Sequence, residues 1–77
     1  MLLEIISPEK KLFSGNASSV TVPGSSGMFQ VLNNHAPIIS TLKKGTVKVE
    51  TAEGEKLFEI NGGVVEVLNN KVVVLAG

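Results

Sequence analysis

Near its C-terminal end the sequence reads Val64-Val65-Glu66-Val67-Leu68-Asn69-Asn70-Lys71-Val72-Val73-Val74-Leu75. Two valine-rich runs flank Asn69-Asn70, and asparagine is the residue other than glycine that best tolerates a left-handed backbone. The stretch therefore predicts two antiparallel strands joined by a tight turn. The second run, Lys71–Leu75, is apolar on both faces, which indicates a strand in the centre of a sheet.

The same pattern continues upstream of this hairpin. Apolar residues alternate with polar ones at Val20 and Val22, at Val47 and Val49, and at Phe58 and Ile60. This period of two marks strands with one buried face. A second tight hairpin is predicted at Ala52-Glu53-Gly54, because glycine adopts a positive φ freely. Further turn signals are Ser14-Gly15-Asn16, Pro23-Gly24-Ser25-Ser26-Gly27, Asn33-Asn34, Lys43-Lys44-Gly45 and Gly62-Gly63, the last as a bend or bulge within the sheet.

The regular spacing of short strands defines the expected fold class. No stretch keeps a helical period for three turns, so we predict an all-β fold, a flattened antiparallel β-sandwich or barrel of about ten short strands. The 77 residues predict a single domain over 1–77. Because the chain has no cysteine, its stability must come from packing Val, Ile and Leu side chains, aided by a partner surface.

The composition excludes several classes of function. Lysine and glutamate balance at seven each, and arginine and aspartate are absent, so the electrostatic signature of nucleic-acid binding is missing. No run approaches the ~20 apolar residues of a membrane span, and no signal peptide opens the chain. We therefore expect a cytoplasmic protein with no direct membrane insertion. Any association with a membrane would go through another protein.

Catalytic and metal-binding motifs are also missing. His35 is the only imidazole, and a nucleophile, base and orienting group cannot be assembled around it. One histidine without cysteine makes a zinc site implausible. Gly24-Ser25-Ser26-Gly27 lacks the lysine and the helix that a phosphate-binding loop needs. We expect no enzyme activity, no cofactor and no metal.

Two large apolar side chains, Met28 and Phe29, directly follow the glycine-serine turn. In a strand, neighbouring side chains point to opposite faces, so Phe29 is expected inside and Met28 outside. An exposed apolar side chain beside a loop marks a contact site. The alternative is that Met28 fills a small satellite core.

His35 lies in Asn33-Asn34-His35-Ala36-Pro37, a turn that enters the next strand. The simplest interpretation is a turn histidine whose ring bonds the neighbouring backbone. The alternative makes it part of a surface for a partner. The residues alone favour the first interpretation.

Together these motifs resemble a known family. The pattern Pro23-Gly24-x-x-Gly27-x-Phe29-x-Val31-Leu32-x-x-His35-Ala36-Pro37, followed by Leu42-x-x-Gly45-x-Val47 and Gly62-Gly63-x-x-Glu66-Val67, resembles the epsilon subunit of F-type ATP synthases. The resemblance covers the whole chain and implies the N-terminal β-sandwich domain of that family. The resemblance favours the interpretation of His35 as an interface residue.

The resemblance implies a non-catalytic rotor subunit. It would link the gamma subunit of the central stalk to the membrane c-ring, and so couple proton transport to ATP synthesis. It would be a peripheral protein on the cytoplasmic face of the inner (cell) membrane, held there through the ATP synthase complex.

The resemblance also implies two contact sites. The c-ring edge would comprise Ser25, Ser26, Gly27, Met28 and Phe29, with Asn33 and Asn34 beside it. The gamma interface would include Ser7 and His35.

Two departures from the family pattern matter. Family members often have an acidic residue where Met28 stands and a glycine where Gln30 stands, so the ring contact here is expected to be apolar. Many members also continue into a two-helix domain that restrains ATP hydrolysis. The sequence ends at Gly77, and we expect the sandwich without that helical domain.

A lipoyl- or biotinyl-type carrier domain is the alternative from another class. Such domains are all-β and present a modified lysine at a hairpin tip. Lys71, directly after Asn69-Asn70, is the only candidate here, and it lacks the flanking residues of a carrier site. A third reading is an unspecified structural module, which survives only if no stalk partner binds.

Overall fold

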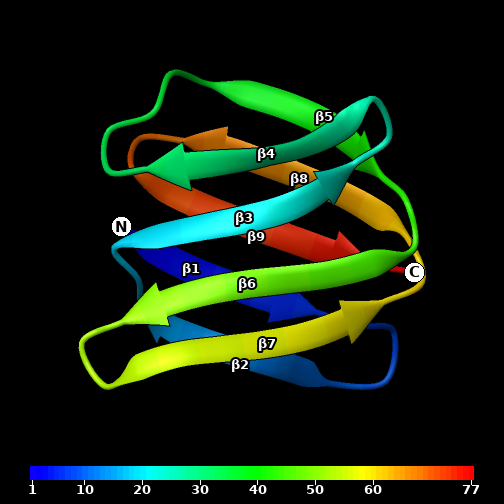
Figure 1. The fold of residues 1–77 in the computed structure, drawn as a ribbon, viewed down its shortest axis with the longest axis horizontal. Coiled ribbons are helices and arrows are strands. Elements are labelled where there is room, and N and C mark those ends of the chain that lie inside the picture. The colour runs from blue at the N-terminus through cyan, green and yellow to red at the C-terminus, as the bar shows by residue number, and fades with distance from the viewer.

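The computed structural model describes residues 1–77, and its regular structure consists of strands alone (Figure 1). The strands are β1 (Leu2–Ile6), β2 (Lys11–Asn16), β3 (Ser19–Gly24), β4 (Gly27–Leu32), β5 (Ile38–Leu42), β6 (Gly45–Thr51), β7 (Gly54–Ile60), β8 (Gly63–Leu68) and β9 (Lys71–Ala76). The all-β prediction is confirmed, with nine strands against about ten expected. No helix long and apolar enough to cross a bilayer is present.

The strands form two layers that face each other across the core. We call β3, β4, β6 and β7 the front layer and β1, β2, β5, β8 and β9 the back layer, as they appear in Figure 1. On one side β3 and β5 join the layers by pairing at Gly24 and Leu42. On the other side, the rings of Phe13 in β2 and Phe58 in β7 pack edge to face, with centroids 5.8 Å apart. The result is a flattened barrel closed by backbone pairing on one side and by side-chain packing on the other.

The centre of the back layer is β9, which lies between β1 and β8. It pairs antiparallel with β8 and parallel with β1. The prediction of a central strand over 71–75 is therefore confirmed, whereas the prediction of a purely antiparallel sheet is wrong at this one pair. A parallel pair needs a long crossover connection. Here the whole intervening chain supplies it, because β1 and β9 are the first and last strands.

The core fills the space between the layers and contains one cluster of 16 buried apolar residues. The period of two directs every second side chain of each strand into this space. The fully buried members are Leu3, Ile5, Val20, Val22, Val31, Val47, Val49, Val65, Val67, Val72 and Val74. Both layers contribute, so each covers the apolar side of the other.

Most of the predicted turns are present, with backbone angles that explain their residues. Gly54 has a φ of 116°, and Asn69 and Asn70 have φ values of 52° and 59°. The turn predicted at Ser14-Gly15-Asn16 is wrong: these residues end β2 and pair with Glu4, Leu3 and Leu2 of β1. Tertiary pairing overrides the local turn preference there, since β-propensity depends strongly on context.

The bend predicted at Gly62-Gly63 is also confirmed. Both residues have a positive φ, 131° for Gly62 and 141° for Gly63. A Cβ on Gly63 would lie 2.0 Å from the carbonyl oxygen of Leu75 in the neighbouring β9. A Cβ on Gly54 would meet nothing within 4 Å. Gly63 therefore satisfies both a backbone and a packing constraint, and Gly54 only a backbone constraint.

We expect Gly63→Ala to cost about 3 kcal/mol or more of unfolding free energy, because it adds a backbone clash to the strain of a positive φ. Gly54→Ala should cost only about 1–2 kcal/mol, since only the strain applies. Denaturant unfolding of the two variants measures the difference. If the two variants lost the same unfolding free energy, the close approach of Gly63 to β9 would make no contribution to stability.

Candidate functional site

The turn between β3 and β4 separates Met28 from Phe29 as the pleat requires. Met28 is 62% exposed, and Phe29 packs against the core cluster. Phe29 is only partly buried, because β4 is an edge strand bonded to β3 alone. The predicted division is confirmed, and the interpretation of Met28 as a satellite core residue is wrong.

The residues predicted for the contact with the membrane c-ring fall into two groups. At the hairpin tip the backbone N–H of Ser25 donates to Thr41 O at 3.0 Å, and the Thr41 hydroxyl donates to Ser25 Oγ at 2.8 Å. Ser26, Gly27 and Met28 are exposed beside them. Asn33 and Asn34 follow the other end of β4 (Figure 1). The structure does not bring the two groups together at one end of the molecule.

The asparagine pair instead closes the end of the fold that holds the N-terminus. Asn33 Oδ1 accepts a hydrogen bond from the α-ammonium of Met1 at 2.6 Å. Asn34, with a φ of 62°, donates its backbone N–H to Asn70 Oδ1 at 2.8 Å. These contacts give both residues a structural role independent of any partner.

The two residues predicted for the gamma interface also have local partners. His35 Nδ1 lies 2.7 Å from the carbonyl oxygen of Ala36, as the turn interpretation expects. Ser7 Oγ donates to Lys10 O at 3.0 Å and accepts from the Lys10 N–H at 3.1 Å, which closes the β1–β2 turn. Ser7 follows β1 and His35 precedes β5, so they lie at opposite ends of the back layer.

A broader surface, which the sequence interpretation did not assign, covers the outer side of the back layer. The register aligns side chains across β1, β9, β8 and β5 in three rows. Most are apolar, and we call this surface the apolar face: Leu2, Ile6, Ile39, Val64, Leu68, Val73 and Leu75. Ile39 is 72% exposed and Leu75 is 52% exposed. Contiguous exposed apolar side chains of this kind indicate an interaction site.

A signal for this surface was present in the sequence. The run Lys71–Leu75 is apolar on both faces, a pattern typical of a strand covered on both sides. In the structure the side bearing Val72 and Val74 is buried, and the side bearing Leu75 is open to solvent. The uncovered apolar side of a central strand is therefore what the pattern encoded.

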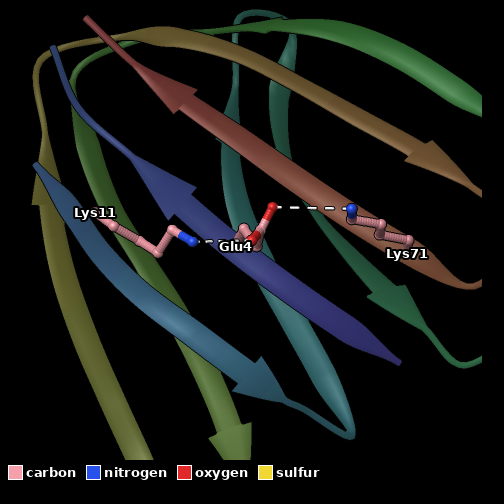
Figure 2. A network of polar contacts seen from close by, with 3 residues as sticks. All are labelled: Glu4, Lys11 and Lys71. Atoms are coloured by element: carbon pink, nitrogen blue, oxygen red, sulfur yellow. Dashed lines mark hydrogen bonds and ion pairs between the residues drawn. The ribbon is translucent and has the colours of Figure 1, made fainter.

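Charged side chains on the apolar face form a small network around Glu4 (Figure 2). Lys11 of β2 approaches Glu4 Oε2 to 3.2 Å, and Lys71 of β9 approaches Glu4 Oε1 to 3.9 Å. Both lysine side chains are about half exposed, so water screens these pairs and each adds little to stability. The network neutralises Glu4 within the chain.

The outer side of the front layer differs in character. Lys48 and Glu55 form an ion pair at 3.2 Å, and the Thr46 hydroxyl donates to Glu59. Leu57 is 60% exposed but lies opposite Lys48 and between glutamates. An isolated exposed leucine needs no partner to explain it.

The arrangement offers binding surfaces rather than reactive groups. No group of three or more His, Cys, Asp or Glu side chains could hold a metal ion. The carboxylates are spread over strand faces and turns, and the only imidazole contacts a backbone carbonyl.

Known proteins share this sequence pattern over its full length. The family model described as the β-sandwich domain of the ATP synthase delta/epsilon chain matches residues 1–77. The chain belongs to this family. The resemblance inferred from the motifs is therefore confirmed, and membership leaves no basis for the carrier-domain interpretation of Lys71.

Individual relatives support the assignment. The ATP synthase epsilon chain of Chlorobaculum tepidum is 45% identical over 74 residues, which cover 95% of this chain and 84% of the relative. That of Desulfatibacillum aliphaticivorans is 50% identical over 78 residues, covering 99% of this chain and 55% of the relative. The sandwich thus spans most of one relative and little more than half of the other.

Solved structures share the fold at low sequence identity. A chain in the Tetrahymena thermophila mitochondrial ATP synthase central stalk and c-ring structure aligns with a TM-score of 0.82 at 18% identity, covering 97% of this chain and 61% of that one. A chain in the Euglena gracilis mitochondrial enzyme aligns with a TM-score of 0.89 at 21% identity, covering 96% and 48%. At such identities the likeness shows the common fold.

We expect Met28→Glu to change unfolding free energy by no more than about 0.5 kcal/mol, as for other exposed positions. Phe29→Ala should cost about 2–3 kcal/mol, below the ~3–5 kcal/mol of a fully buried phenylalanine, because the ring is only partly covered. Thermal or denaturant unfolding of the two variants tests this. A large loss for Met28→Glu would mean that its side chain packs inside.

Proposed function

We propose that this chain is a non-catalytic rotor subunit of an F-type ATP synthase, which links the gamma subunit of the central stalk to the membrane c-ring. The observation that carries the proposal is the apolar face, an uncovered apolar surface on an otherwise well-packed sandwich. Family membership and the epsilon-chain names of its relatives support it. The matched structures contain the central stalk or F1 with the c-ring, which supports the same setting.

The apolar face is the proposed docking surface for the gamma subunit. Ser7 follows β1 and His35 precedes β5, and the strands β9 and β8 lie between β1 and β5. The two residues are therefore at diagonally opposite corners of the back layer. A partner that covers the apolar face would therefore reach both residues. Ser7 and His35 can therefore belong to one interface although they lie far apart.

The exposed β3–β4 hairpin tip is the proposed contact with the c-ring. Ser25, Ser26, Gly27 and Met28 are exposed there, and Met28 offers an apolar anchor. Asn33 and Asn34 would join the same contact only if it ran the whole length of β4. Phe29 would support the tip from inside by packing against the core.

The proposed role is mechanical, so the fold must transmit force without deforming. Of 47 backbone hydrogen bonds, 39 lie within the strand ladders, and the connections between strands are short. No bond is made or broken in the subunit. It would couple proton transport to ATP synthesis while sitting peripherally on the cytoplasmic face of the cell membrane, held by the complex.

The direct test is isolation of the assembled complex from membranes of the source organism. A tagged copy of the full chain, solubilised in mild detergent, should retain the gamma subunit and the c-ring together. Recovery of intact ATP synthase without the tagged chain, while that chain is folded and abundant, would overturn the proposal.

The apolar face gives a sharper prediction through a pair of matched variants. Ile39→Ser and Leu57→Ser each remove a highly exposed aliphatic side chain from a strand, Ile39 from β5 of the back layer and Leu57 from β7 of the front layer. Because burying such a side chain contributes about 1.5–3 kcal/mol, Ile39→Ser should weaken gamma binding about 10- to 100-fold. Leu57→Ser should leave it unchanged. Titration of gamma by calorimetry measures both, and equal effects would remove the apolar face from the interface.

The ring contact has its own matched pair on β4. Met28 and Leu32 point to the same side and are 62% and 53% exposed. We expect Met28→Glu to reduce assembly with the c-ring about 10-fold or more, because a buried contact of methionine is replaced by a charge. Leu32→Glu, at the far end of β4, should assemble normally. Equal loss in both would mean that the ring contact extends along β4 to Asn33 and Asn34.

A further inference from the structure

The two carboxylates on the apolar face have different surroundings. Glu4 is neutralised within the chain, by Lys11 at 3.2 Å and by Lys71 at 3.9 Å. Glu66 lies in the same row of side chains, with Val73 of β9 between the two carboxylates. Every ion pair of the chain involves a glutamate other than Glu66. Glu66 is therefore the carboxylate of this face without a counterion.

The neighbours of Glu66 on the outer surface are apolar. Val73 lies directly opposite on β9 and Ile39 directly opposite on β5. Val64 and Leu68 precede and follow it by two positions on the same side of β8. A single charge thus stands within a ring of aliphatic side chains, the arrangement in which a central polar contact is sealed from water when a partner binds.

Lys71 is the only lysine on the two strands that flank β8, so it is the cation of these strands that could compete for this carboxylate. It lies opposite Leu2 on one side and Leu68 on the other, so it is a diagonal neighbour of both Glu4 and Glu66. Its ammonium group is directed toward Glu4 (Figure 2). The chain as folded therefore leaves Glu66 to be neutralised from outside.

Covering the apolar face would remove water from Glu66. A buried charge without a partner is strongly unfavourable, whereas a paired and hydrogen-bonded one is tolerated. A partner with a purely apolar surface would thus be rejected, and a partner with a lysine or arginine at this point would be selected.

We infer that Glu66 is the charged anchor of the apolar face, pairing with a lysine or arginine of the protein that covers it. This rests on the proposed function, in which the gamma subunit is that protein. The partner surface would then be apolar with one basic side chain opposite the centre of β8. Such an ion pair fixes the orientation of the partner on the apolar face, which contact between apolar side chains alone does not fix.

The test measures binding of the gamma subunit from the same organism to the full chain and to three variants. Glu66→Gln keeps the shape and removes the charge, and we expect binding to weaken about 10- to 100-fold. Glu53→Gln, at the exposed β6–β7 turn, is the matched control and should bind like the unaltered chain. Ile39→Ser, which tests the apolar face itself, should also weaken binding.

The pattern of losses separates the two ideas. If Ile39→Ser binds weakly but Glu66→Gln binds normally, the apolar face stands and the anchor is overturned. If both variants bind normally, or if the unaltered chain does not bind gamma, the docking surface fails and the anchor fails with it. Loss in both, with Glu53→Gln unaffected, supports the anchor.

Two further variants identify the source of the counterion. Glu66→Lys should abolish binding, and a single Lys→Glu or Arg→Glu change in gamma should restore it. If Lys71 moved to Glu66 on binding, Lys71→Met would weaken binding as much as Glu66→Gln, with no further loss in the double variant. That result, or the failure of every charge reversal in gamma to rescue Glu66→Lys, would overturn a counterion from the partner.

Discussion

The parallel pairing of β1 with β9 is the contact on which the rest of the molecule depends. It joins the first strand of the chain to the last, through five aligned residue pairs from Leu2–Lys71 to Ile6–Leu75. Without it the back layer would divide into β2–β1 and β9–β8–β5, and the core would open along its length. The inward residues Leu3, Ile5, Val72 and Val74 are fully buried only because these strands lie side by side. The pair also brings Glu4 and Lys71 onto one surface.

The thinness of the sandwich explains why so much apolar area is left outside. A chain of 77 residues has room for one shared layer of side chains between its sheets. Strands at the centre of the back layer are nevertheless apolar on both sides, so their outer side chains remain uncovered in the isolated chain. The presence of these apolar residues on the outer side fits the proposed interface.

Much of the fold could be predicted from the sequence, because alternation and turn residues act locally. The Asn69-Asn70 and Gly54 turns follow from backbone conformations that few other residues adopt. The parallel β1–β9 pair could not be predicted, since it joins residues about seventy positions apart through no local signal. The strand at Ser14-Gly15-Asn16 could not be predicted either, because these residues by themselves favour a turn and are held extended by pairing with β1.

The candidate site divides in the same way. The pleat alone predicted that Met28 points out and Phe29 in. The apolar face could not be predicted as a site from the sequence. A strand that the chain itself covers on both sides has the same apolar sequence pattern as a strand with one side open to a partner protein. Only the three-dimensional arrangement distinguishes them. Likewise, the distance between Ser7 and His35 follows from strand order and direction, which the motif resemblance did not specify.

A flat apolar face raises a difficulty for the proposed rotor subunit, which would have to turn with its neighbours. Apolar contact is nearly non-directional, so a partner could slide along the strands with little change in buried area. Transmission of torque requires that the two surfaces stay in a fixed register. Polar groups fix that register because their hydrogen bonds and ion pairs form at one relative position only. On this face Glu4 and Lys71 already satisfy each other, with Lys11 as a second cation. The Thr41 hydroxyl on β5 is hydrogen-bonded to Ser25 Oγ, so the Glu66 carboxylate on β8 is the charged group of this surface that remains available to a partner. The stiffness of the sandwich and the register of its interface thus depend on different residues, the first on the valine core and the second on those few polar positions outside it.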